Sequence, residues 1–374
     1  AKKVRKIIQQ TFWNHESQFY SFGKQADGAF NPEKTVLPTV AMHFDLTEAE
    51  NSEKCLVEYA SANFSSDWGT RMVDQNSALY NPSGYHTGSV WPLFTGWVSL
   101  AEYKYNRPTQ GFIHVMNNLL PYKNWEAGYL EEVLHGEYFQ PAGVCAHQAW
   151  SESMVLQPIL EGMLGLGREA RNNHVTLKPA FPPHWKFAAF RNIRVGENQL
   201  HLKMKREPHR TTFKFLTNSS KPFHVHFKPT SLLGTNISTI YVANHKVSEN
   251  VFISKYSDFP ALDFSLAKEM IVVINHSGGL GLVPPVPRPR LNQASWGLRV
   301  TDETWKDGHY ILTIEGKAGH EYHLQIIDYD HIIRSVQNAM IERQEKERLP
   351  ILVRIAAKAS KDSYIRKVII LSTI

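Results

Sequence analysis

Acidic and imidazole side chains gather in residues 128–153, which read GYLEEVLHGEYFQPAGVCAHQAWSES. Glycoside hydrolysis is one reaction that needs such groups, because one carboxyl protonates the leaving oxygen and another activates water or attacks carbon. Glu131 and Glu132 are candidates for one of these carboxyls. Neighbouring side chains on an extended segment point to opposite sides, so one glutamate could enter a cavity while the other is paired or solvated. The spacing does not decide between them, and surface charge is the ordinary role of a single glutamate.

A second group lies in residues 65–92, SSDWGTRMVDQNSALYNPSGYHTGSVWP, where polar side chains alternate with large rings. The chemistry-bearing members are Asp67, Trp68, Arg71, Tyr85, His86 and Trp91. Sugars are bound by this mixture, because rings cover C–H faces while charged and amide groups hold the hydroxyls. A structural interpretation is equally open, with the two tryptophans as core anchors and Asp67 and Arg71 as an ion pair.

Other chemistries fit the sequence less well. Cys145 and His147, like His135 and Glu137, are two residues apart, whereas structural zinc sites normally pair cysteines two to four apart. No G-x-S-x-G, P-loop or dinucleotide fingerprint occurs. We therefore expect neither a metal nor a cofactor.

Composition narrows the possible partners. The 374 residues are 42% hydrophobic and 20% charged, which is typical of a globular protein long enough for two domains. A net charge of +6 without a long basic block does not favour nucleic-acid binding. No apolar run is long enough to predict a membrane span. The two cysteines, Cys55 and Cys145, cannot form a disulfide framework.

The secondary structure that the apolar spacing predicts changes from helix to strand near residue 170. Helical apolar spacing predicts helices at 3–20, 33–45, 47–63, 87–106, 109–120 and 148–167. Thr87 or Ser89 could cap the fourth of these, and Pro92 is tolerable in its first turn. The long loops 64–86 and 121–148 carry the chemical groups, as functional loops often do.

After residue 170 the apolar period becomes two. Strands are predicted at 198–207, 211–217, 223–229, 238–244 and 269–275, and again over 297–327, 351–357 and 364–372. Residues 331–347 are predicted as a short helix. The expected fold class is α + β in two domains, with a helical domain at 1–168 and an antiparallel β-sandwich at 169–374.

The chain resembles six-hairpin, (α/α)6-barrel glycosidases. The resemblance lies in four segments and their order along the chain: DWGTR, YHTGSVWP, GYLEEVL and HQAWS. The chain is most similar to the C-terminal domain of amylo-α-1,6-glucosidase (glycogen-debranching) enzymes and to mannosylglycerate hydrolase and family 63 relatives. The resemblance implies that residues 1–168 form the second half of an (α/α)6 toroid and that the β region is an accessory domain.

The resemblance also implies roles for individual residues. Glu132 falls on the general base, with Glu131 as the second choice because it occupies a position where proline is frequent. The residues that match the family's substrate-binding segments are Asp67, Trp68, Arg71, Tyr85, His86, Trp91, Gln148 and Trp150. The family's general acid is an aspartate far upstream. We therefore expect this chain to be a C-terminal piece of a longer enzyme.

The expected activity is hydrolysis of an α-linked glucoside or mannoside with inversion, and the expected partner is an oligosaccharide or glycoside. The alternative is a carbohydrate-binding protein that holds glycans without cutting them. A third, structural interpretation makes the same loops an interaction module. The sequence predicts neither the sugar, nor the compartment, nor the oligomeric state.

Overall fold

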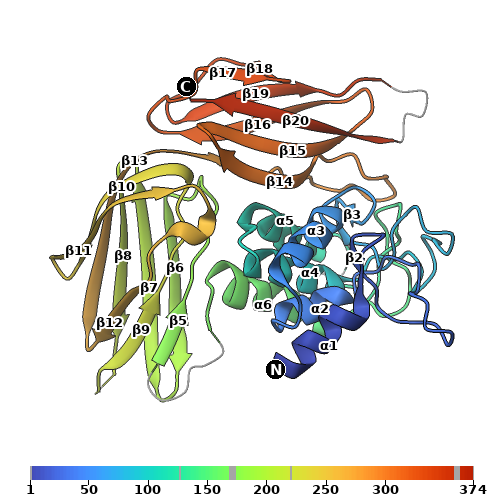
Figure 1. Ribbon diagram of the computed structural model, residues 1–374, viewed down its shortest axis with the longest axis horizontal. Helices are drawn as coiled ribbons and strands as arrows, with labels where there is room; N and C mark the ends of the chain where they lie inside the picture. Colours follow the sequence, from blue (N-terminus) through green and yellow to red (C-terminus); the bar gives the residue numbers. More distant parts are fainter. Residues whose placement is uncertain (1, 126–127, 168–173, 220, 358–362, 374) are drawn as a thin grey trace.

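The computed structural model describes residues 2–125, 128–167, 174–219, 221–357 and 363–373. Its helices gather in one unit and most of its strands in two further units (Figure 1). The helices are α1 Lys2–Phe12, α2 Pro38–His43, α3 Ala49–Tyr59, α4 Pro92–Lys104, α5 Pro108–Leu119, η1 Leu120–Lys123, α6 Ala149–Gln157 and the π-helical η2 Pro158–Met163. The described helices do not by themselves form a closed barrel, so the half-toroid stays a prediction.

The central helix α4 is buried on most sides and packs against α2, α5 and α6. Pro92 lies in its first turn, as predicted, but the predicted capping by Thr87 or Ser89 is wrong. Trp91 occupies the N-cap in an extended conformation without a side-chain cap, while the Ser89 hydroxyl donates to the Tyr85 carbonyl at 2.6 Å. The N-cap position of α4 is therefore occupied by Trp91, whose indole contacts the preceding loop at Tyr85.

The predicted helix 3–20 ends at Phe12, and a short hairpin of β1 Trp13–Asn14 and β2 Phe19–Tyr20 follows. The Asn14 side-chain oxygen accepts hydrogen bonds from the backbone N–H groups of Glu16 and Ser17. Such local side-chain bonds offer the backbone an alternative to the helix. The predicted helix 33–45 shrinks for a similar local reason, because Pro38 occupies the first turn of α2 and lacks an N–H for a longer helix.

Three sheets carry most of the strands that follow the helices. The nine-stranded sheet has β6 Phe187–Val195, β7 Asn198–Glu207, β8 Arg210–Thr217, β10 Leu233–Val242, β11 His245–Ile253, β13 Glu269–Leu282, β16 Glu321–Asp328, β18 Met340–Ile341 and β19 Arg348–Arg354. The three-stranded sheet has β5 His174–Leu177, β9 Phe223–Phe227 and β12 Leu262–Leu266. The four-stranded sheet has β14 Arg299–Lys306, β15 His309–Lys317, β17 Ser335–Gln337 and β20 Tyr364–Ser372. A further hairpin, β3 Ser65–Ser66 with β4 Gly69–Thr70, lies in the helical unit, and η3 Tyr256–Asp258 is a 3-10 turn.

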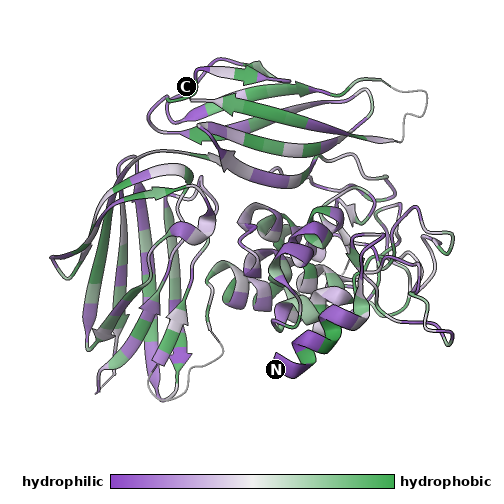
Figure 2. Cartoon of the chain, in the orientation of Figure 1, coloured by the Kyte–Doolittle hydropathy of each residue, from purple (hydrophilic) through white to green (hydrophobic). Residues whose placement is uncertain are grey.

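The nine-stranded sheet contributes to two separate cores. One core fills the space between it and the three-stranded sheet, and the other lies between β16, β19 and the four-stranded sheet. Strand β13 joins them, pairing with β8 over Glu269–Asn275 and with β16 over Leu280–Leu282. Gly278 and Gly279 between these stretches have φ of 65° and 85°, which allows the change of direction. Apolar and polar residues alternate along several of these strands in Figure 2, as the sequence predicts.

Two predictions for the β region are wrong. Residues 331–347 do not form a helix; they contain β17 and β18, which pair with β20 and β19. Pairing to open sheet edges overrides the local helical spacing there. The sheets are also not wholly antiparallel, because β5 and β9 run parallel. The predicted domain boundary at residue 168 lies outside the described residues.

No helix in the described part of the chain combines the length and hydropathy that a membrane span requires.

Candidate functional site

Two loops that are distant in sequence meet beside α4. The backbones of Val90 and Leu134 exchange two hydrogen bonds of 2.8 Å. On the other side of the same segment, the Glu132 N–H donates to the Cys145 carbonyl at 2.9 Å and the Gln148 N–H donates to the Leu130 carbonyl at 3.1 Å. Residues 130–134 therefore lie between the 85–90 loop and the segment that enters α6.

Glu132 faces Tyr85 across this junction. The Tyr85 hydroxyl donates to Glu132 Oε1 at 2.8 Å. Glu132 is 6% exposed, whereas Tyr85 is 39% exposed, so the phenol lies between the carboxylate and the surface. Desolvation raises the pKa of Tyr85, and the hydrogen bond to Glu132 and its charge raise this pKa further. The phenol therefore stays protonated at neutral pH and remains a hydrogen-bond donor.

Tyr85, the donor of this hydrogen bond, belongs to a cluster of three rings with His86 and Trp91. His86 stacks on Trp91 with centroids 5.6 Å apart and planes 9° apart. Tyr85 packs edge-on against each of them at 4.6 Å. The Trp91 indole N–H donates to the Tyr85 carbonyl at 2.8 Å, which holds the loop against the N-terminus of α4. The result is a carboxylate behind a phenol, with an exposed imidazole and a buried indole beside it.

Glu131 is as buried as its neighbour, at 7% exposed. Burial therefore does not distinguish the two carboxylates, and neither of them is solvated. Gln148 is the N-cap of α6, and its carbonyl accepts from the N–H groups of Ser151 and Glu152. Trp150 lies in the first turn of α6 and is 42% exposed.

Asp67 does not pair with Arg71. Its carboxylate accepts from Arg299 Nη1 at 2.7 Å and from the backbone N–H groups of Trp296 and Gly297 at 3.0–3.1 Å. At 1% exposed it has no free surface for a ligand. Its role in the structure is to attach the 64–72 loop to the start of β14, and this arrangement argues against its predicted contact with a sugar.

Trp68 and Arg71 are likewise buried, at 1% and 4% exposed. The Trp68 indole donates to the His135 carbonyl at 2.9 Å, and Arg71 Nε donates to the Gly136 carbonyl at 2.8 Å. These two side chains fix the segment that follows Glu132. Their direct contact with a sugar stays a prediction that their burial does not favour.

The sequence reasoning missed Arg299 as a partner of the loop. It is 5% exposed and also donates from Nε to the Ser65 carbonyl at 2.9 Å. The available signal was its place at the start of β14, next to the buried Leu298 and Val300, where a charged residue requires a buried partner. The reasoning also missed Tyr129 and His147, whose exposed rings stack at 4.0 Å beside residues 130–132.

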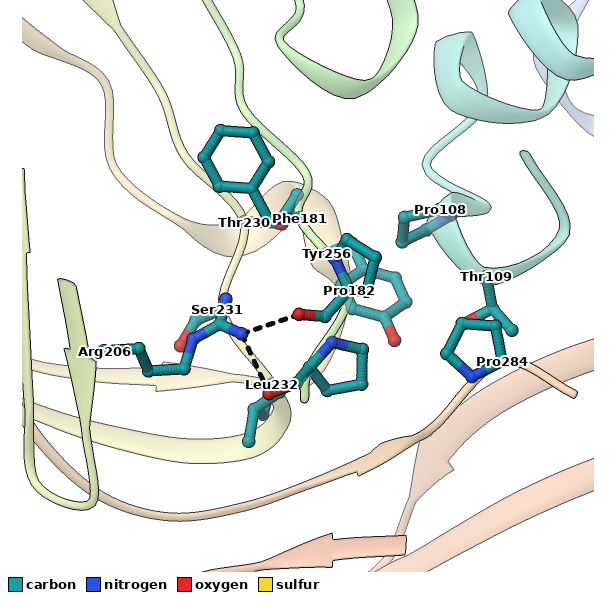
Figure 3. A pocket seen from close by; sticks show the side chains of 11 residues that line it. Pro108, Thr109, Phe181, Pro182, Arg206, Thr230, Ser231, Leu232, Tyr256 and Pro284 are labelled. Carbon is teal, nitrogen blue, oxygen red and sulfur yellow. Dashed lines mark hydrogen bonds between the residues drawn. The ribbon is translucent and has the colours of Figure 1, made fainter. Parts of the chain in front are cut away.

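A cavity at the junction of the three units does not serve as a substrate site. It is lined by residues of the α5 start, the 181–183 and 230–232 segments, Tyr256 and Pro284, and Arg206 reaches across it to the carbonyls of Pro182 and Pro183 (Figure 3). Its volume is about 20 Å³, which suits a water molecule rather than a sugar.

Among the residues with described positions, no group of three or more His, Cys, Asp or Glu side chains could hold a metal ion.

Residues 1–141 match the family model of the mannosylglycerate hydrolase MGH1-like glycoside hydrolase domain. The matched stretch includes Tyr85, His86, Trp91 and both Glu131 and Glu132. The match supports a glycosidase. No curated protein sequence matches the chain.

Several solved glycosidases are similar to parts of the structure. The family 63 mannosylglycerate hydrolase from Thermus thermophilus in complex with glucose is 17% identical over 40% of this chain and 36% of its own, with a TM-score of 0.33. Neutral trehalase from Saccharomyces cerevisiae is 11% identical over 41% and 28%, with a TM-score of 0.34. A family 127 β-L-arabinofuranosidase from Geobacillus stearothermophilus T6 is 6% identical over 90% and 56%, with a TM-score of 0.33. The chain thus spans about a third of the length of the mannosylglycerate hydrolase.

Proposed function

We propose that this chain forms part of an inverting glycoside hydrolase in which Glu132 is the general base. The observation that carries the proposal is the hydrogen bond from Tyr85 to Glu132 beside Trp91, within the stretch that matches a glycoside hydrolase family. In this mechanism the Glu132 carboxylate takes a proton from a water molecule as that water attacks the anomeric carbon.

Tyr85 is the positioning residue for this base. Its hydroxyl engages Oε1 and leaves Oε2 to receive the proton from water. A donor held at hydrogen-bonding distance fixes the carboxylate rotamer before the substrate arrives, which lowers the cost of reaching the reactive geometry. His86 is exposed and stacked on Trp91, so its free face can cover the C–H face of a sugar ring. Gln148 and Trp150 extend the proposed binding surface along the start of α6.

An inverting mechanism requires a second carboxyl group about 6.5–9.5 Å from the base, so that water fits between base and sugar. We propose that this acid comes from the half of the barrel that the family resemblance places upstream of these residues. The substrate class that agrees with the family match is an α-linked mannoside or glucoside, with mannosylglycerate as the first compound to test.

The test is hydrolysis by the protein that contains these residues and their upstream partner. The panel comprises mannosylglycerate, α-glucosides and α-mannosides, with the configuration of the first-formed product read by proton NMR. Glu132→Gln should lower kcat by at least about a thousandfold while sugar binding persists, because the amide cannot accept the proton. Glu137→Gln, a glutamate of the same loop, is the matched control and should retain activity.

Two outcomes would contradict this assignment. Normal turnover by Glu132→Gln together with loss of turnover by Glu131→Gln would transfer the base role to Glu131. Binding of glycosides without hydrolysis by the unmodified protein would support the non-catalytic alternative.

A further inference from the structure

A second groove lies on the helical unit, at the C-terminal end of α1. Its volume is about 570 Å³, within the range of small-ligand sites. The residues that line it are Gln9, Gln10, Trp13, Asn14, His15, Glu16, Ala29, Phe30 and Pro32. None of them belongs to the 85–91 or 130–150 segments that carry the candidate active site.

The walls of this groove are held by hydrogen bonds within two consecutive hairpins. In the first, Trp13 pairs with Tyr20, and the indole packs on the Tyr20 ring at 4.9 Å. In the second, the Asn31 N–H donates to the Gly23 carbonyl and the Gln25 N–H donates to the Ala29 carbonyl. The Ser21 hydroxyl donates to the carbonyl of Gly23. The groove is therefore formed before any ligand arrives, which reduces the entropy cost of binding.

Carboxamides dominate its polar lining. The Gln9 side-chain oxygen accepts from the Tyr20 hydroxyl, and the Asn14 oxygen accepts from the N–H groups of Glu16 and Ser17. With both oxygens engaged, the NH2 groups of Gln9 and Asn14 are the parts of these amides left to a ligand. Gln10 and Glu16 are exposed and supply further donors and an acceptor.

The polar groups of the lining indicate the ligand class. The titratable residues that line the groove are His15 and Glu16. The Lys24 and Lys54 ammonium groups lie over the rings of Phe30 and Trp13, 4.6 and 5.9 Å from the ring centroids. Amide donors, one carboxylate acceptor and the half-buried Phe30 ring fit a neutral molecule with many hydroxyl groups and apolar C–H faces.

We propose that this groove is a second carbohydrate-binding site that takes a neutral oligosaccharide of about two to four sugar units. It goes beyond the proposed hydrolysis, because it needs none of the residues around Glu132. It would hold a polymeric or branched glycan on the helical unit at a point separate from the place of cleavage.

The test is isothermal titration of the protein with maltotetraose, cellotetraose and mannotetraose, all on a His86→Ala background that weakens the first site. Gln10→Ala combined with Glu16→Ala removes two exposed polar groups of the groove and leaves the third, His15, in place. Gln25→Ala combined with Glu53→Ala is the matched control, since these exposed residues of the same types lie outside the lining. Thermal melting of each variant establishes that it is folded.

We expect at least one tetrasaccharide to bind the His86→Ala protein, with affinity falling tenfold or more in the groove variant and unchanged in the control. The side-chain indole N–H signal of Trp13 should shift in NMR spectra on titration. Absence of binding by all three sugars, or equal binding by groove and control variants, would overturn the proposal. Neither result depends on hydrolysis. The binding test of the groove can therefore fail or succeed independently of the test of Glu132 as the general base.

Discussion

The Tyr85 hydroxyl lies 2.8 Å from Glu132 Oε1, although 47 positions separate the two residues in sequence. The contact exists because Val90 and Leu134 pair their backbones and so bring the two loops together. It joins a residue from each of the two chemistry-bearing segments and gives the buried carboxylate a fixed donor.

Tyr85→Phe should lower kcat/KM about tenfold or more without unfolding the protein. The change removes only the hydroxyl, and a hydrogen bond to a charged group contributes about 1.5–3 kcal/mol. Because Tyr85 is 39% exposed, thermal stability should change little. Steady-state kinetics on the best substrate of the panel and thermal melting check both parts. Unchanged kcat/KM would remove Tyr85 from the mechanism.

Arg299→Met should destabilise the protein by about 3–5 kcal/mol, because it leaves the Asp67 carboxylate buried without its cation. The double variant Arg299→Met with Asp67→Asn should lose less than the sum of the single losses, since neither charge then remains unpaired. Urea unfolding measures both. Arg354→Met, which breaks an exposed pair with Glu321, is the control and should cost at most about 1 kcal/mol.

His114 should make the protein less stable in acid. Burial and the nearby charges of Arg299 and Arg107 lower its pKa from 6.5 to about 3. Between pH 6.5 and 3 the unfolded chain therefore binds a proton that the folded chain does not. The free energy of unfolding then falls as the pH decreases through this range, by up to about 1.4 kcal/mol per pH unit.

The check for this acid effect is urea unfolding at pH 7, 5.5 and 4.5. His114→Gln should show a shallower decrease in stability with pH than the unmodified protein. His245→Gln, at an exposed position, should follow the unmodified protein. An equal pH dependence in all three proteins would argue against His114 as a source of acid sensitivity.

Gly96→Ala should destabilise the protein by about 1–3 kcal/mol, despite the higher helix propensity of alanine. A Cβ at Gly96 would clash with the side chain of Met154, where α4 and α6 cross. Because α6 begins at Ala149, the clash would also displace Gln148 and Trp150. Thermal melting tests this, with Gly23→Ala as the control because nothing lies within 4 Å of a Cβ there. Equal melting temperatures would show that α6 accommodates the methyl group.

Elements with a strong, uninterrupted period were predictable from the sequence. The helix predicted at 109–120 is α5, the strand predicted at 198–207 is β7, and the strand predicted at 364–372 is β20. Strand β7, for example, buries Leu200, Leu202 and Met204 at every second position, so its period reflects its packing. The segments 13–20 and 331–347 failed because an asparagine turn and pairing to sheet edges determine them, and neither leaves a long periodic pattern.

For the candidate site, the sequence alone determined which chemical groups are neighbours along the chain. Tyr85, His86 and Trp91 lie in one short segment, and Glu131 and Glu132 are adjacent. Only the tertiary structure decided which groups meet. It placed Tyr85 on Glu132, left Glu131 equally buried, and paired Asp67 with Arg299, 232 positions away, rather than with Arg71. The physical reason is that spacing constrains neighbours along one segment, whereas the partner of a buried charge depends on which distant backbones exchange hydrogen bonds.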